Sequence, residues 1–321
     1  MIEYLRFEEW MAFDAAHPAP TFFARPPWAL ALADAHASMQ PAPVRMTLEA
    51  GERIIVPMMQ MAGGAIRWRE YCAFPMGGYT CFLREDGSLA TPLQCDEALL
   101  LLRRSADSVR IVPWPLGSGP SVGKRTAHET AVVDLGGGID NALAGVAGIF
   151  RRMAGQAERR GVVCAPSRDH GAVDEYYRLL QASAKRWGIE RPSISKAMLH
   201  ALVRRGGDDV EIWFARAQER NIGGGVVFYG SQEFFFWSAA MDAEYGRLRP
   251  SNALNFALLR AASARGMQYY NLGSSEGLPG VAKFKDNLGA REIAYHDLTL
   301  VRAPYKVYSS VRRALATHAG I

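Results

Sequence analysis

The residues with the clearest chemical potential lie near the end of the chain, in the stretch GVAKFKDNLGA at residues 280–290. Lys283 and Lys285 stand there on either side of Phe284, in a glycine-containing segment that we expect to be a loop leaving the core. A lysine ammonium beside a reacting carbonyl stabilises the charge that develops on its oxygen. From the residues alone, the segment is a solvated basic turn, a phosphate cradle or part of an active site.

Motifs for other chemistries are missing from the sequence. The order Gly-x-x-x-x-Gly-Lys-Ser/Thr does not occur between Gly273 and Ala290, which excludes the phosphate cradle of ATPases. No Gly-x-Ser-x-Gly elbow occurs, and the four cysteines have no zinc-ligand spacing. We therefore expect direct attack by an amine without a covalent intermediate, and neither a metal nor another cofactor. Asp242, Glu244 and Glu276 are candidate general bases, although such residues are more often helix caps or surface charges.

The composition is that of a globular protein, with 49% hydrophobic and 21% charged residues in a chain of 321. No apolar run reaches the ~18 residues that a membrane span needs. Glu3, Glu8 and Glu9 occupy the region where a signal peptide would be basic and then apolar, so the sequence predicts a cytoplasmic protein. A net charge of +5 is compatible with a polyanionic ligand such as tRNA, a nucleotide-linked substrate or a membrane surface.

The second half shows a regular order of elements. The pattern predicts a helix over 174–188, three antiparallel strands over 210–218, 222–230 and 233–242, and a helix over 252–266. For the helix over 252–266, Ser251 or Asn252 is the expected N-cap and Gly266 is the expected C′ glycine. A buried strand (267–272), the loop just described, a last strand (291–301) and a basic helix (305–320) follow. This is the order of elements in a GNAT-type acyltransferase.

The first half repeats that outline. We expect a helix over 28–39, a hairpin turning at Gly63-Gly64, a helix over 96–108 and a strand over 108–116. A loop containing Lys124 and Arg125 follows, then a short strand (128–135) and one helix (138–161). The turn at Gly63-Gly64 has a counterpart at Gly223-Gly224, which suggests an internal duplication. The predicted fold is α/β (α+β), with two tandem GNAT-like domains at 1–150 and 151–321, each a mixed sheet flanked by helices.

Four stretches then resemble the FemABX family of aminoacyl transferases. They are FFARPPWALAL (22–32), FPMGGY (74–79), the long run from Ser238 to Gly273, and GVAKFKDNLGA. The resemblance implies two GNAT-like domains with the active site in the second and an acceptor channel lined by the first, including Tyr79. The long coiled-coil arm of some members is absent, because Trp187 and Val210 are too close in sequence.

The same resemblance implies roles for single residues. Lys285 would stabilise the oxyanion, and Phe284 would orient the acyl group. Lys283 fits a phosphate contact or plain solvation equally well. Related sequences often carry an acidic residue where this chain has Asn271, which we count among the substrate-binding candidates together with Tyr79.

The donor is the main open choice. GNAT enzymes that use acetyl-CoA bind its pyrophosphate with an Arg/Gln-x-x-Gly-x-Gly/Ala turn before a helix. This chain has AEYGRLRPSNAL there, with Arg247 and Arg249 but a single glycine. We therefore expect an aminoacyl group from aminoacyl-tRNA to be transferred to the amine of a cell-wall (peptidoglycan) precursor, amino sugar or small metabolite. An N-acyltransferase dependent on acyl-CoA or an acyl carrier, and a non-catalytic binding protein, are the alternatives.

Overall fold

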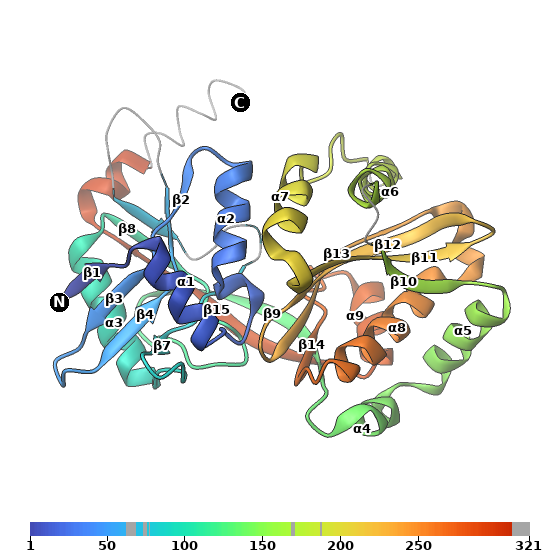
Figure 1. Ribbon diagram of the computed structural model, residues 1–321, viewed down its shortest axis with the longest axis horizontal. Coiled ribbons are helices and arrows are strands. Elements are labelled where there is room, and N and C mark those ends of the chain that lie inside the picture. Colours follow the sequence, from blue (N-terminus) through green and yellow to red (C-terminus); the bar gives the residue numbers. More distant parts are fainter. Residues whose placement is uncertain (62–68, 73–75, 77, 168–170, 187, 310–321) are drawn as a thin grey trace. The chain divides into compact units, whose positions relative to one another are not determined.

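The computed structural model describes residues 1–61, 69–72, 76, 78–167, 171–186 and 188–309 of a mixed α/β protein (Figure 1). By its internal contacts the chain forms two compact units. The first contains Met1–Ala19, Phe23–His128 and Tyr295–Ile321; the second contains Pro20–Phe22 and Glu129–Ala294. These units differ from the expected halves 1–150 and 151–321. Residues 129–150 pack with the second unit, and the chain returns to the first after residue 294 because β15 (Arg291–Val301) pairs with β8 (Ser108–Ile111).

The second unit is built around one mixed sheet. Its strands, in spatial order, are β10 (Val163–Ser167), β11 (Val210–Ala217), β12 (Arg220–Tyr229), β13 (Glu233–Met241), β14 (Tyr269–Asn271) and the end of β9 (Lys124–Asp134). Its helices are α4 (Gly138–Gly145), α5 (Gly148–Arg159), α6 (Ala172–Arg186), α7 (Lys196–Gly206), α8 (Pro250–Ala264) and α9 (Pro279–Asn287). The pair β13–β14 is parallel and the other pairs are antiparallel.

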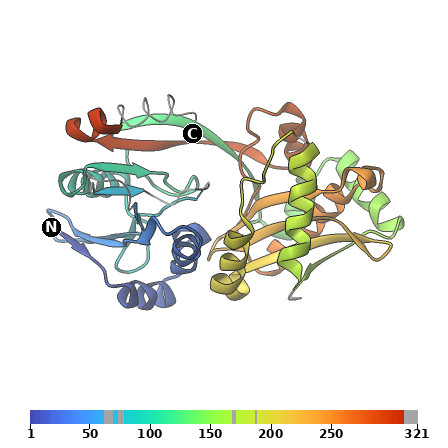
Figure 2. The ribbon, with the colours of Figure 1, turned by 90° about the horizontal axis from the view of Figure 1, so that it is seen from above.

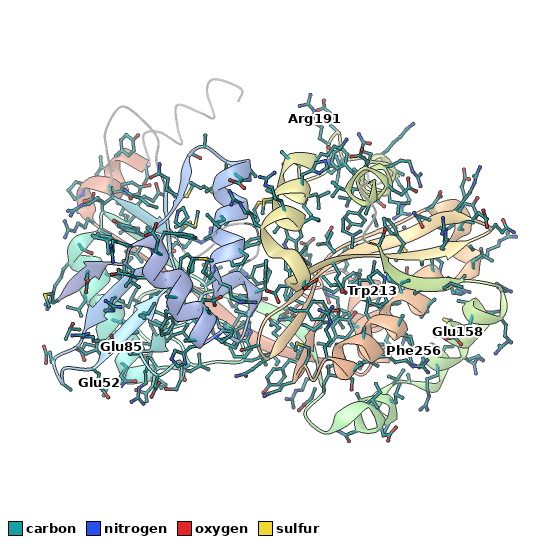
Figure 3. All side chains as sticks on the ribbon, in the orientation of Figure 1. Glu52, Glu85, Glu158, Arg191, Trp213 and Phe256 are labelled. Carbon is teal, nitrogen blue, oxygen red and sulfur yellow. The ribbon has the colours of Figure 1, made fainter. Side chains whose placement is uncertain are left out.

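Helices cover both faces of this sheet (Figures 1 and 2). Helices α4, α5 and α8 lie on one face, and α6 and α7 on the other. The hydrophobic cluster under α5 and α8 includes Trp213 of β11 and, at its margin, Phe256 of α8, both labelled in Figure 3. Alternate residues of the strands therefore serve two cores, as expected for a sheet that is buried on both sides.

The three consecutive antiparallel strands are confirmed, as is the buried strand beside a parallel neighbour. The first turn lies at Gln218 and Glu219, both with positive φ, rather than at 219–221. The glycines of β12 allow close packing: a Cβ on Gly225 would lie 2.1 Å from the ring of Phe236. The expected close backbone approach is therefore observed.

Several predicted helices differ from those in the structure. The single helix over 138–161 is two helices, α4 and α5, with a break at Val146 and Ala147. Helix α7 was not expected. The N-cap of α8 is Arg249, not Ser251 or Asn252, because Pro250 takes the first helical position. Gly266 has φ +72° just after the helix, as expected for a C′ glycine.

The most consequential correction concerns residues 273–289. The expected loop ends at Leu278, and residues 279–287 form α9, with Pro279 at its start. Proline is tolerated in the first turn of a helix, where its missing N–H costs nothing. Lys283, Phe284 and Lys285 thus lie on a helix, and Gly289, with φ +90°, lies two residues beyond its end.

The first unit has two groups of strands. One sheet has the order β1 (Ile2–Tyr4), β3 (Val44–Thr47), β4 (Arg53–Val56), β7 (Leu83–Arg84); the other strands follow the order β15, β8, β6 (Glu70–Cys72), β5 (Met59–Met61), β2 (Met39–Pro41). Its helices among the described residues include α1 (Phe7–Ala16), α2 (Pro26–Ala35) and α3 (Pro92–Ser105). Strands β5 and β6 pair antiparallel as expected, but the Gly63-Gly64 turn lies outside the described residues.

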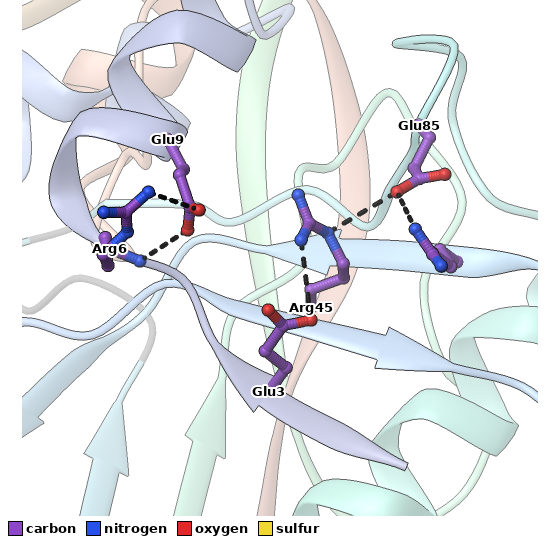
Figure 4. A network of polar contacts seen from close by, with 6 residues as sticks. Glu3, Arg6, Glu9, Arg45 and Glu85 are labelled. Carbon is purple, nitrogen blue, oxygen red and sulfur yellow. Dashed lines mark hydrogen bonds and ion pairs between the residues drawn. The ribbon is translucent and has the colours of Figure 1, made fainter.

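Charged residues link the strands of this unit at its surface (Figure 4). Arg45 of β3 lies 3.5 Å from a carboxylate oxygen of Glu3 and 3.5 Å from one of Glu85. Such exposed pairs contribute little each, on the order of 0–1 kcal/mol. Lys124 and Arg125, expected in a loop, begin strand β9. Of the C-terminal helix predicted over 305–320, residues 305–309 are helical, in a helix that begins at residue 303, and the remainder lies outside the described residues.

Candidate active site

A cavity of about 630 Å³ opens in the second unit. Its wall is formed by β13, the segment after it, the first turns of α8, one side of α9 and the end of α6. The apolar part of the lining includes Phe236, Trp237, Met241, Leu272, Val281 and Phe284. Among its polar members are Ser183, Arg186, Ser238, Asp242, Arg249, Ser251, Asn252, Asn255 and Lys285.

Lys285 is the buried cation of this cavity. The residue is 7% exposed, and its Nζ donates hydrogen bonds to the carbonyl oxygens of Gly273 and Ser274, each at 2.8 Å. Burial lowers the pKa of Lys285 to about 8, while more distant carboxylates raise it by a smaller amount. An ammonium group has three N–H donors, so one remains for a ligand in the cavity.

Phe284 lies beside Lys285 on α9 and also lines the cavity. Its ring centroid is 5.1 Å from that of Phe150 on α5, with the planes at 59°. Phe284 packs against the main cluster of the unit. The aromatic wall is therefore held by the core behind it.

Asn271 has a structural position. It is completely buried on β14, where its Oδ1 accepts hydrogen bonds from Thr130 (2.6 Å) and from the backbone N–H of Gly273 (2.9 Å), and its Nδ2 donates to Glu233 (2.8 Å). It does not line the cavity. Asn271 holds the start of the segment whose Gly273 carbonyl binds Lys285, so its contact with the site is indirect.

The remaining basic candidates differ in whether they line the cavity. Arg249 is exposed, has left-handed backbone angles (φ 60°, ψ 42°) and lines the cavity at the start of α8. Arg247 is exposed, and its carbonyl accepts a hydrogen bond from Arg160. The Lys283 ammonium forms an ion pair with Asp286 at 2.7 Å, and 70% of its side chain is exposed. Neither Arg247 nor Lys283 is part of the cavity lining.

Tyr79 belongs to the first unit, whereas Lys285 belongs to the second. It is 2% exposed, and its ring meets those of Phe23 and Tyr295 edge-on at 5.5 and 5.6 Å. Of the stretch FPMGGY, residues 73–75 and 77 lie outside the described part of the chain.

The candidate bases also differ in position. Asp242 lines the cavity, while Glu244 and Glu276 are exposed and do not. The thiols are poor nucleophiles, because burial raises the pKa of Cys164 and of Cys95 to about 12. Among the described residues, no group of His, Cys, Asp and Glu is arranged to hold a metal ion.

Sequence reasoning missed three polar residues of this region. Ser238 and Asn252 line the cavity, and the hydroxyl of the buried Tyr176 donates to Ser238 Oγ at 2.7 Å. Ser238 follows the point where the β12–β13 register shifts, and Asn252 looked like a helix cap. No local pattern distinguishes these residues from ordinary strand and cap residues, because their exposure to the cavity depends on tertiary packing.

Comparisons with known proteins agree with this architecture. Residues 147–286 match the family model described as acetyltransferase (GNAT) domain. The chain has the fold of the solved structure of FemX, with a TM-score of 0.71, 11% sequence identity, and coverage of 96% of this chain and 99% of that one. The predicted resemblance is confirmed at the level of the fold.

Two further structures share the fold. One is a conserved protein of unknown function from Bacteroides thetaiotaomicron (TM-score 0.57, 13% identity, 94% of this chain and 100% of that one). The other is the C-terminal domain of a putative lysylphosphatidylglycerol synthetase from Agrobacterium fabrum (TM-score 0.55, 14% identity, 97% of each chain). No curated protein matches by sequence. No helix of the described residues has the length and apolarity to cross a membrane.

Proposed function

We propose that this chain transfers an acyl group from an activated ester or thioester to an amine, forming an amide in the cavity of the second unit. The observation that carries the proposal is Lys285: a buried ammonium, fixed by two backbone carbonyls, with one donor left at the wall of a cavity. Fixed donors in a water-poor site stabilise a developing oxyanion without reorganising during the reaction.

The proposed steps use few groups. The acceptor amine attacks the acyl carbon, and the carbonyl oxygen becomes an oxyanion that accepts the third N–H of Lys285. The tetrahedral intermediate then collapses: the bond from the acyl carbon to the leaving oxygen or sulfur breaks, and the new C–N bond remains. The proton lost by the amine is delivered to that leaving group. Asp242 is our candidate to carry it, because it lines the cavity where the other two candidate bases do not.

An aminoacyl ester carried by tRNA is our proposed donor. At the start of α8, Pro250 has no N–H, and the N–H groups of Asn252 and Ala253 both bond to the carbonyl of Arg249, which leaves fewer backbone donors for the pyrophosphate of CoA. Exposed Arg247 and Arg249 are close in sequence to this helix start and suit an anionic donor. Transfer to a peptidoglycan precursor, amino sugar or small metabolite in the cytoplasm belongs to the same proposal, as does an acceptor channel in the first unit that includes Tyr79.

Turnover assays test the proposal directly. Purified protein is incubated with either aminoacyl-tRNA or acetyl-CoA and a panel of amines, and amide products are measured by mass spectrometry. We expect turnover with aminoacyl-tRNA. Turnover with acetyl-CoA alone would instead support the acyl-CoA alternative, and no turnover with either donor would favour a binding protein.

The lysine is tested with a matched pair of variants on α9. Lys285→Ala should lower kcat by about 10²–10³-fold, as loss of one oxyanion donor does elsewhere. Asp286→Ala, on the next residue, removes only the exposed ion pair with Lys283 and should leave kcat within about twofold. Undiminished turnover in Lys285→Ala would refute the assignment.

A further inference from the structure

Ser238 is a hydrogen-bond donor whose direction is set by a buried neighbour. Tyr176, on α6, is completely buried, and its hydroxyl donates to Ser238 Oγ at 2.7 Å. Burial raises the pKa of Tyr176, so the phenol keeps its proton. Because Oγ accepts from Tyr176, its own hydrogen points elsewhere, and no acceptor for it occurs among the described residues. Ser238 lines the cavity, so this donor is available to a ligand there.

Asn252 supplies a second polar group in the lining of the same cavity. It lies in the first turn of α8, is only 8% exposed and lines the cavity. Its side-chain amide has no hydrogen-bond partner within the described part of the chain. Asn255, one turn later, is different: its Nδ2 donates to the carbonyl of Ser251, and its Oδ1 accepts from Tyr270. The amide of Asn252 faces the cavity, so a polar group of a ligand can replace the water bound to it.

The cavity also has an apolar part. Phe236, Met241 and Leu272 also line the cavity. A few neutral polar groups set in an apolar wall are typical of a site that selects a ligand by hydrogen bonding. Neither group is charged, in contrast to Lys285, so they suit a neutral carbonyl or hydroxyl oxygen better than an ion.

We propose that Ser238 and Asn252 are specificity-determining residues that bind a neutral amide or hydroxyl substituent of the substrate in this cavity, and that Tyr176 is a positioning residue acting through Ser238. This rests on the proposed function only in identifying the cavity as the place where substrate binds. A substrate with a plain alkyl group at this position would bury both polar groups without partners. The site therefore discriminates against it.

Binding of small probes tests the inference without any assumption about the donor. Benzamide and its apolar isostere α-methylstyrene are titrated into the full chain, and dissociation constants are measured by protein-observed NMR. We expect benzamide to bind at least 5-fold more tightly. Asn252→Leu and Ser238→Ala should each weaken benzamide binding about 5- to 10-fold while leaving α-methylstyrene binding within 2-fold. Equal affinity for the two probes, or variants that bind benzamide like the wild type, would overturn the inference.

Two more measurements separate a ligand-binding role from a structural one. Asn252→Leu should leave the melting temperature within roughly 2 °C of the wild-type value, because the amide has no hydrogen-bond partner in the described part of the chain; a larger decrease would mean that the amide has a structural partner. Tyr176→Phe should weaken benzamide binding about 3-fold, and the matched Tyr177→Phe, on the next residue of α6, should not. If Tyr176→Phe has no effect on a wild-type-like fold, Tyr176 does not position Ser238.

The experiments also distinguish a failure of the specificity site from a failure of the acyl-transfer proposal. Lys285→Ala should lower kcat by about 10²–10³-fold, as stated for the proposed function, and retain the benzamide preference. If no donor supports turnover but benzamide binding depends on Ser238 and Asn252, the acyl-transfer proposal fails and the specificity site stands. If turnover is found and both variants keep the wild-type KM and benzamide affinity, the specificity site fails and acyl transfer stands.

Discussion

Lys285 combines burial with hydrogen bonds from its ammonium to two backbone carbonyls. A lysine in a dry environment tends to lose its proton, yet its ammonium is retained at neutral pH when carbonyl oxygens accept its hydrogens. The two carbonyls of Gly273 and Ser274 do this and also fix the position of Nζ. The pKa of about 8 leaves the group mostly charged at pH 7 and brings its titration into an accessible range.

The pH dependence of catalysis follows from that value. If the ammonium form of Lys285 stabilises the oxyanion, kcat/KM should fall above pH 8, approaching tenfold per pH unit, because the folded enzyme loses this proton as pH rises through its lowered pKa. The measurement is kcat/KM from pH 6 to 10. In Lys285→Arg the side chain stays charged throughout, so the falling limb near pH 8 should disappear even though the rate is lower. A limb that persists in Lys285→Arg would belong to another group.

At the scale of elements, β12 depends on glycines that bring β13 close. Besides the clash with Phe236, a Cβ on Gly225 would lie 2.8 Å from the carbonyl oxygen of Ser238, which is backbone and not free to rotate away. Phe236 and Ser238 both line the cavity. The glycine run thus connects strand packing with the shape of the site.

Gly225→Ala should therefore damage both stability and function. Overpacking of this kind costs about 1–3 kcal/mol, and displacement of β13 should also lower kcat/KM. Gly148→Ala is the control, since a Cβ there has nothing within 4 Å; it should leave stability unchanged or raise it by up to about 1 kcal/mol. Urea unfolding of both variants gives the comparison. If the two variants were equally stable, β12 and β13 would be able to move apart around the added methyl group without loss of stability.

Local pattern was sufficient for the strands of the second unit but not for α9. Alternating large residues and the turn at Gly230 define β11, β12 and β13, and Gly266 marks the end of α8. Pro279 and Gly280 are typical of a turn, so they hid a helix that is held by the hydrogen bonds of Lys285 and by the packing of Phe284 and Leu288 against the core. The motif around Phe284 pointed to the right side chains. The exposure of Ser238 and Asn252 to the cavity could not be predicted from local sequence, because it depends on β13 and α8 lining the same cavity in the folded protein.

At the scale of the molecule, the compact units are not continuous in sequence. The carbonyl of Pro20 accepts hydrogen bonds from the N–H groups of Gln232 (3.1 Å) and Glu233 (2.9 Å), and Gly230 packs against the Pro20 backbone. Three residues from the N-terminal region therefore complete the β12–β13 turn of the second unit. Nothing in the local sequence of Pro20–Phe22 reveals this, because the partner strands lie more than half the chain away.

Adjacent phenylalanines should accordingly report on different units. Phe22, 1% exposed, stacks on Phe228 of β12 with ring centroids 4.8 Å apart, whereas Phe23, fully buried, meets Trp28 at 4.9 Å and Tyr79 at 5.5 Å. Truncating either ring to alanine should cost about 3–5 kcal/mol. By hydrogen-exchange mass spectrometry, Phe22→Ala should increase exchange most in β11, β12 and β13, and Phe23→Ala in α2 and the segment around Tyr79. Increased exchange in the same unit for both variants would contradict the assignment of Pro20–Phe22 to the second unit, because a side chain destabilises first the core from which it is removed.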